Sequence, residues 1–151
     1  MLRELDTWID EAAVTLGIPL ERLTQNDALL VTEEIRVKFV DGSPRVWWLG
    51  LKTPYTYYDS DSTRLSQVLP KLNGKLLLIP ESDDEGPLAV LKIEATCIEK
   101  LIGACPFFEY YVVDSDKSWL VAETEHNIFI VCNASESAVN VLPGGRIWPT
   151  K

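Results

Sequence analysis

The chain has 151 residues, of which 46% are hydrophobic and 25% charged, a composition that excludes disorder over its whole length. Its 14 Lys and Arg face 23 Asp and Glu, and the net charge of -9 repels phosphate backbones, which argues against a nucleic-acid partner. There is no apolar run long enough to span a bilayer or to direct export, so we expect a cytoplasmic protein without a membrane partner. A single domain over residues 1–151 is long enough to bury its own core.

Apolar residues near the start of the chain recur at three- and four-residue steps, from Leu2 through Ile9 to Leu16. This spacing predicts an amphipathic helix with its charged residues turned away from the apolar stripe. Gly17 follows, with Ile18 and Pro19 after it. A glycine in the left-handed conformation is a common helix end, so we expect the helix to stop there.

Residues 34–40 alternate between charged and apolar side chains, which predicts a strand with one exposed face. Residues 41–44 have the sequence Asp-Gly-Ser-Pro, which is typical of a turn. Residues 46–51 are largely apolar and would form the returning strand of a hairpin. Trp47 and Trp48, in that strand, are expected to lie mostly in the core.

The middle of the chain predicts five further elements. They are a loop over residues 54–61, a helix over residues 65–72 that Pro70 shortens or kinks, a buried central strand over residues 75–80, an acidic surface loop over residues 81–86 and a strand over residues 88–93.

Residues 96–102 predict a helix that Thr96 caps and Gly103 ends. Three β-rich segments follow, separated by polar turns, and we interpret them as an antiparallel meander over residues 108–113, 119–123 and 128–132. Strands that arrive as hairpins, with helices between groups of strands, favour an α+β fold: a single domain with a largely antiparallel sheet and helices packed mainly on one face.

Catalytic and metal-binding patterns are missing from the sequence. His126 is the only histidine, which excludes a His-rich zinc site. Cys97, Cys105 and Cys132 have wide spacings, and we interpret them as reduced thiols in the core. There is no glycine-rich phosphate loop. We therefore assign no catalytic residue, no metal and no cofactor.

Two groups of residues are nevertheless candidate sites. A pocket beside the meander would use acidic and aromatic side chains around the one imidazole, and its candidate residues are Glu109, Tyr111, Trp119, Glu123 and His126. A patch for a basic protein partner would combine tyrosines with carboxylates, and its candidate residues are Tyr57, Tyr58, Asp59, Asp61, Asp83, Asp84 and Glu85. The alternative for the first group is a solvated turn, and for the second a solvated charge run with tyrosines that cover a core edge.

The segment from Glu109 to Val113, with Trp119-Leu120, Glu123 and His126 after it, resembles the C-terminal part of small acidic bacterial proteins of unknown function. It is similar in character to immunity proteins of bacterial toxin systems. The resemblance implies a small, cytosolic α+β protein without enzyme motifs, and it carries over no catalytic residue.

The leading hypothesis from the sequence is therefore a non-enzymatic protein-binding module, such as a toxin-neutralising immunity protein that covers a basic effector. A first alternative is a small hydrolase or ligand-binding domain that uses Glu109, Glu123 and His126. A second alternative is a structural homodimer, joined through an edge strand or an aromatic patch.

Overall fold

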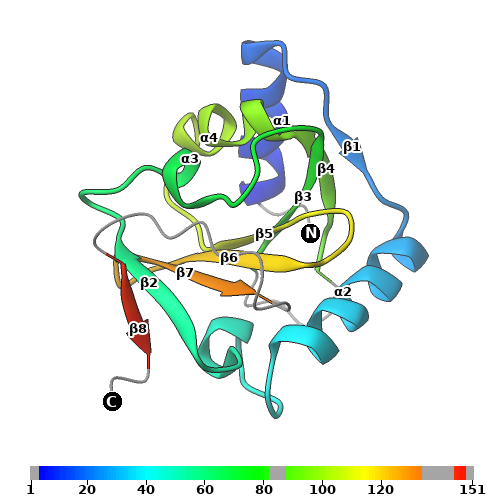
Figure 1. Ribbon diagram of the computed structural model, residues 1–151. Helices are drawn as coiled ribbons and strands as arrows, with labels where there is room; N and C mark the ends of the chain where they lie inside the picture. The colour runs from blue at the N-terminus through cyan, green and yellow to red at the C-terminus, as the bar shows by residue number, and fades with distance from the viewer. Residues whose placement is uncertain (1–3, 82–87, 134–144, 149–151) are drawn as a thin grey trace.

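The computed structural model describes residues 4–81, 88–133 and 145–148. Within these residues the chain forms an eight-stranded antiparallel sheet in the order β1-β4-β3-β5-β6-β7-β2-β8, with helices on its faces (Figure 1). The predicted α+β class and the antiparallel sheet are confirmed. Among the described helices, none has the length and apolar character needed to cross a membrane.

The described part of the chain contains the following elements. The helices are α1 (Glu4–Leu16), α2 (Gln25–Phe39), α3 (Leu65–Val68) and α4 (Ala95–Gly103), with a short 3-10 helix, η1 (Trp47–Gly50). The strands are β1 (Glu21–Arg22), β2 (Tyr55–Asp59), β3 (Lys75–Pro80), β4 (Leu91–Glu94), β5 (Tyr110–Val113), β6 (Trp119–Thr124), β7 (Ile128–Asn133) and β8 (Arg146–Trp148).

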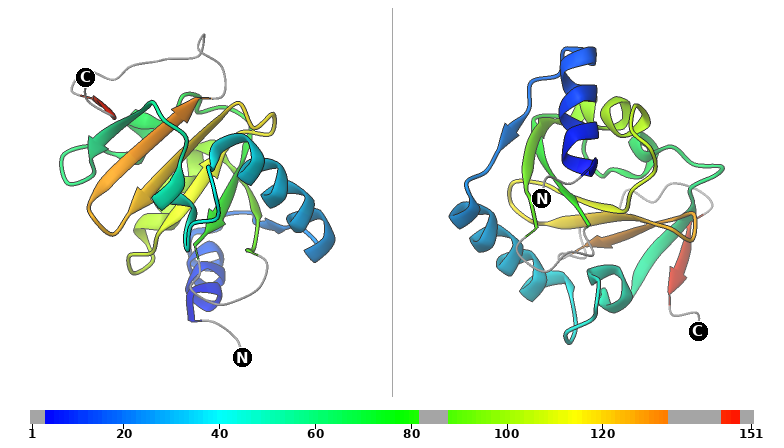
Figure 2. Two further views of the ribbon diagram at one scale, coloured as in Figure 1. Left: turned by 90° about the horizontal axis from the view of Figure 1, so that it is seen from below. Right: turned by 180° about the vertical axis from the view of Figure 1, so that it is seen from behind.

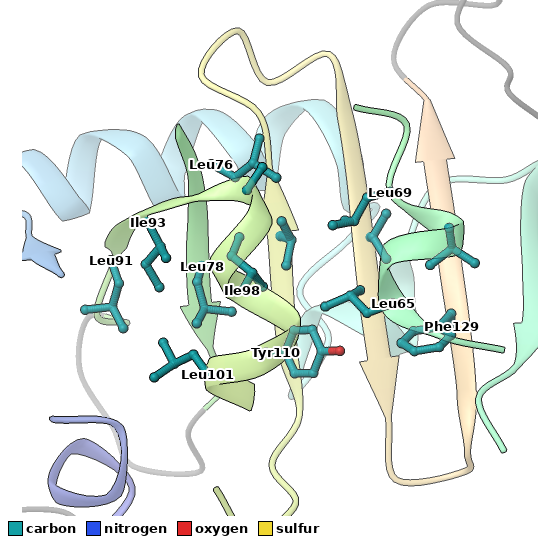
Figure 3. Close-up of a cluster of buried hydrophobic side chains, with 14 of the residues drawn as sticks. Leu65, Leu69, Leu76, Leu78, Leu91, Ile93, Ile98, Leu101, Tyr110 and Phe129 are labelled. Carbon is teal, nitrogen blue, oxygen red and sulfur yellow. The ribbon is translucent and has the colours of Figure 1, made fainter. Parts of the chain in front are cut away.

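The sheet has an apolar core on each side, because successive side chains of a strand point to opposite faces. On β3, Leu76 and Leu78 face the core under α1, α3 and α4, which we call the α1 face. Leu77 and Ile79 face the core under α2 and η1, which we call the α2 face. Figure 2 shows α1 and α4 on one side of the sheet and α2 on the other. In Figure 3, Leu78 lies beside Ile98 of α4 in the first of these cores.

The end of α1 matches its prediction. Gly17 has φ +68°, and its amide donates to the carbonyl of Val14 at 3.2 Å. The amide of Ile18 donates to the carbonyl of Ala13 at 2.9 Å. These two bonds form a Schellman motif, which glycine favours because a Cβ atom is strained at positive φ.

The predicted strand over residues 34–40 is wrong, because these residues form the second half of α2. Thr24 caps this helix, and its Oγ1 accepts a hydrogen bond from the amide of Asp27 at 3.2 Å. Ile35 and Phe39 are buried, whereas Val37 is 57% exposed. Ile35 and Phe39 are four residues apart, so they share a face both in a helix and in a strand. Val37 would share that face only in a strand, so its exposure is what distinguishes the two structures.

The predicted hairpin is half correct. The chain does reverse, since Val40 and Leu51 form an antiparallel bridge and the amide of Asp41 donates to the carbonyl of Gly50 at 2.7 Å. The returning strand over residues 46–51 is wrong, however, because η1 occupies most of it, and its tryptophans are only half-buried. The apolar character of this segment reflects packing on the α2 face and not pairing in the sheet.

Most of the remaining elements agree with the sequence. The buried strand over residues 75–80 is β3, Pro70 limits α3 to one turn, and the meander is present as β5, β6 and β7. Two predictions are wrong. Tyr55 to Asp59 form a strand instead of a loop, because β7 supplies a pairing partner, and α4 begins at Ala95 with Glu94 at its cap position instead of Thr96.

Candidate functional site

A groove of about 860 Å³ lies at the end of β2. It combines the last residues of β2, the segment that leads into α3, the turn between β6 and β7, and the first residue of β8. We call it the β2 groove, and it is lined by Tyr57, Tyr58, Asp59, Asp61, Ser62, Thr63, Gln67, His126, Asn127, Ile128 and Arg146. Figure 1 shows β2, β7 and β8 side by side at this edge of the sheet.

Local hydrogen bonds hold the acidic rim of the groove in place. The carboxylate of Asp59 accepts a hydrogen bond from the amide of Asp61 at 2.9 Å, a turn that aspartate forms readily. The amide of Ser60 donates to the carbonyl of Asn127 at 2.9 Å and so joins this rim to the β6–β7 turn. Asn127 has φ +60°, a conformation that asparagine tolerates better than most residues. The rim is therefore built by one side-chain-to-backbone bond and one backbone bond, which leave the Asp61 carboxylate exposed.

The charged groups of the β2 groove are two carboxylates and two basic side chains. Asp59 and Asp61 are exposed, and neither carboxylate forms an ion pair within the described residues. Arg146 is exposed and also lacks an ion pair there. His126 is exposed, with its Nε2 4.0 Å from the carboxylate of Glu125. Since solvent screens exposed charges, each of them is available to a partner at small desolvation cost.

Glu123 lies behind the acidic rim, on the α1 face. Tyr110 donates its hydroxyl hydrogen to Glu123 Oε1 at 2.7 Å, and the Ser60 hydroxyl donates as well. Burial raises the pKa of Glu123, and the nearby Asp61 carboxylate adds to the rise, although both hydroxyl bonds oppose it. Figure 3 shows the Tyr110 hydroxyl directed toward Phe129, away from Leu78. Glu123 therefore holds its proton more tightly than a free glutamate.

Glu99, on the same face of the sheet, has a pKa shifted in the opposite direction to that of Glu123. Burial raises its pKa, but the amide of Ser66, at 2.9 Å, and the guanidinium of Arg64, at 2.5 Å, outweigh burial and hold the pKa below its ordinary value. These bonds tie α4 to the start of α3. The two glutamates should therefore shift the stability of the protein in opposite directions as the pH changes.

We expect Glu123→Gln and Glu99→Gln to show opposite pH dependence in urea unfolding. A raised folded-state pKa contributes stability at low pH that is lost as the pH rises above 4.5, so Glu123→Gln should gain stability relative to wild type from pH 4.5 upward. A lowered folded-state pKa contributes stability at higher pH that is lost as the pH falls below 4.5. Glu99→Gln should therefore be less stable than wild type above pH 4.5, and this difference should shrink below it. Parallel pH profiles of the two variants would contradict these environments.

A second polar network lies on the α2 face. The Tyr111 hydroxyl donates to Glu81 Oε1 at 2.5 Å and accepts a hydrogen bond from the amide of Trp48 at 3.2 Å. The amide of Trp47 donates to the same Glu81 oxygen at 3.4 Å. Burial raises the pKa of Tyr111 and the charge of Glu81 adds to this rise, so the hydroxyl stays protonated. The network fastens η1 to β5.

His126 packs beside this second network without joining its hydrogen bonds. Its ring packs edge-on against Trp48, with 5.3 Å between the ring centroids. The turn that carries it is held by Glu109, whose carboxylate accepts a hydrogen bond from the amide of Glu125 at 2.9 Å. Glu109 and His126 thus meet at one turn on the side of η1, with no hydrogen bond between them.

The residues of the predicted meander pocket do not gather at one point. Tyr111 lies on the α2 face, whereas Glu123 lies on the α1 face, paired in register with Tyr110. Trp119 is 1% exposed and sits in the α1-face core, at the opposite end of β6 from Glu123. Of the five predicted residues, His126 alone lines the β2 groove.

The residues predicted to bind a partner fall into two sets. Tyr57, Tyr58, Asp59 and Asp61 all line the β2 groove, although Tyr58 is 5% exposed and forms a buried wall. The acidic loop residues Asp83, Asp84 and Glu85 lie outside the described residues.

Sequence reasoning missed Ser62, Thr63, Asn127 and Ile128 of the groove, and it also missed Gln67 and Arg146. No local pattern marks them, because Gln67 belongs to a predicted helix and Arg146 is separated from β2 by most of the chain.

Burial affects two of the three cysteine thiols. Burial raises the pKa of the Cys132 thiol to about 12, and burial also raises that of Cys105, which makes both poor nucleophiles. In the part of the chain that the structure describes, there is no group of three or more metal-ligating side chains.

Comparison of the chain with protein-family models, with curated proteins and with solved structures finds no match.

Proposed function

We propose that this chain is a non-enzymatic module that binds a basic protein through the β2 groove. The observation that carries this proposal is the placement of two exposed carboxylates, Asp59 and Asp61, along a groove whose wall is formed by Tyr57 and Tyr58. Acidic groups beside tyrosine rings suit the lysine and arginine side chains of a partner. The net charge of -9 would attract such a partner from a distance and raise its association rate.

Toxin neutralisation is the specific role that we favour within this class. An immunity protein in the cytoplasm acts by covering a functional surface of its effector, which requires a complementary surface and no catalytic group. The β2 groove could serve as such a complementary surface, since a basic effector would present its cations to Asp59 and Asp61.

The first alternative, a small hydrolase, needs Glu109, Glu123 and His126 to converge on a substrate. Their positions on two faces of the sheet do not favour it. The second alternative, a homodimer, has one observation in its favour. Ile147 is 61% exposed and Trp148 47% exposed on the terminal strand of the sheet. A sedimentation coefficient that stays at the monomer value at every concentration would exclude this dimer.

The test of the proposed function is removal of the two groove charges. The double variant Asp59→Asn and Asp61→Asn keeps an oxygen at position 59 to accept the Asp61 amide, so the turn should remain. We expect about tenfold weaker binding of a basic partner, mainly through slower association, and a weaker dependence on salt. The partner to be tested by calorimetry is the product of the adjacent gene, and a pull-down from host lysate at low and high salt complements it.

The matched control is the double variant Glu11→Gln and Glu21→Gln, which removes the same charge at a distance from the groove. Both glutamates are exposed, on α1 and on β1 at the opposite edge of the sheet, and neither forms an ion pair within the described residues. This control should bind nearly as well as wild type. Equal loss in both variants would show that total charge and not the groove matters, and binding of no protein at low salt would refute the proposal.

A further inference from the structure

β8 is held to the sheet by its backbone and not by burial of its side chains. All three of its residues, Arg146, Ile147 and Trp148, are exposed, and it pairs with β2 alone (Figure 1). β7, which pairs with the other edge of β2, differs from β8, since its residues Phe129 and Ile130 are buried in the two cores. The two-residue β1, at the other edge of the sheet, is likewise exposed and has one partner. Because burial of apolar surface is the main force that retains a strand, β8 is more easily displaced from β2 than β7 is.

The register identifies which backbone groups of β2 face β8. The amide of Ser60 donates to Asn127 beside β7, so alternation along the strand directs the amides of Tyr58 and Thr56 toward β7 as well. The amides of Tyr57 and Tyr55 then face β8, opposite Arg146 and Trp148. Departure of β8 would leave an open row of donors and acceptors on β2, to which another extended segment could pair.

Arg146 places a positive charge in the β2 groove, as a basic partner would. It lies directly opposite Tyr57, and the alternation of side chains places it on the same face as Tyr57 and Asp59. It lines the groove, yet it forms no ion pair within the described residues. A cation is therefore already present where the proposed partner would place one, and it is only loosely engaged.

The residue before Arg146 adds a size requirement. A Cβ atom at Gly145 would lie 2.7 Å from Thr56 Cγ2 and from the ring of Tyr58, closer than such atoms approach. The backbone of this position therefore packs directly on Tyr58. A segment that took the place of β8 in the same register would need a very small residue here, followed by a basic one.

We propose that β8 is an intramolecular occupant of the partner site, which a basic, extended segment of the partner replaces by pairing with β2. The segment would place a glycine over Tyr58 and an arginine or lysine beside Tyr57 and Asp59. This inference rests on the proposed function, because it states how the basic partner binds. It also assigns a regulatory role to β8, since the open state limits the apparent affinity of the partner.

The test uses a labelled peptide with the sequence of residues 145–151 and full-length chains that differ in β8. Trp148→Pro removes an amide that faces β2 and so weakens the docked strand, whereas Ile147→Pro, the matched control, removes an amide that faces away. We expect the peptide to bind Trp148→Pro about tenfold more tightly than it binds wild type or Ile147→Pro, measured by fluorescence anisotropy. The same peptide with Arg146→Glu should bind much more weakly.

Equal binding to the three chains, or equal binding of the two peptides, would overturn the inference. Hydrogen exchange in the unmodified protein provides a check that no variant affects: the amides of Tyr55 and Tyr57 should exchange faster than those of Thr56 and Tyr58. Equal protection of all four amides would also overturn it. The charge-removal test above leaves β8 intact, so loss of this inference and loss of the proposed function give separate results.

Discussion

Replacing Trp119 with alanine is expected to lower the free energy of unfolding by about 4 kcal/mol, the largest effect among the substitutions considered for this protein. The side chain is 1% exposed and lies in the α1-face core. Its removal would forfeit the transfer free energy of a large ring and leave a cavity that rigid neighbours cannot fill. Part of the loss is offset, because the buried indole N–H has no hydrogen-bond partner among the described residues.

The matched control for this substitution is Trp148→Ala. The Trp148 side chain is 47% exposed on β8, so its loss should change the free energy of unfolding by less than about 1 kcal/mol. Urea denaturation followed by far-ultraviolet circular dichroism measures both. A small effect for Trp119→Ala would contradict its position in the core and would favour the pocket role that the sequence suggested.

Tyr111→Phe is expected to lower the free energy of unfolding by about 2–3 kcal/mol. The substitution keeps the ring in the α2-face core but removes the hydroxyl that serves both Glu81 and the amide of Trp48. A carboxylate loses a charge-assisted hydrogen bond, and a backbone donor loses its acceptor. Because this hydroxyl fastens η1 to β5, we also expect faster hydrogen exchange at Trp48.

Tyr110→Phe provides the comparison, since it removes a hydroxyl that also serves one carboxylate, Glu123. No backbone amide donates to the Tyr110 hydroxyl among the described hydrogen bonds, so we expect a smaller loss of about 1–2 kcal/mol. Thermal unfolding of the two variants measures the difference. If the two losses are equal, or their order is reversed, the Tyr111 hydroxyl does not support η1 as the distances indicate.

Strong local signals in the sequence determined several elements of this protein. Gly17 ends α1 because glycine adopts φ +68° with less strain than any other residue, and no distant contact is needed to predict it. The run over residues 75–80 is apolar at every position after Lys75, which suits a central strand with both faces covered, and it is β3. The polar turns between β5, β6 and β7 likewise specify a local antiparallel meander.

Other elements depend on contacts that a single sequence does not express. Ile35 and Phe39 fit the buried face of a helix or of a strand, and the choice was made by the core of the α2 face, which takes both side chains from a helix. The residues around Tyr57 have the polar composition of a loop, yet they form β2 because β7 and β8 offer hydrogen bonds on both sides.

The candidate site shows the same division. Residue types alone identified the tyrosines and carboxylates of residues 57–61 and the single imidazole, His126, as notable. Only the tertiary structure brought them to one groove, added Arg146 from the end of the chain, and separated Glu123 from Tyr111. The physical reason is that periodicity along a chain reports which side of an element is buried, whereas the order of the strands decides which distant side chains meet.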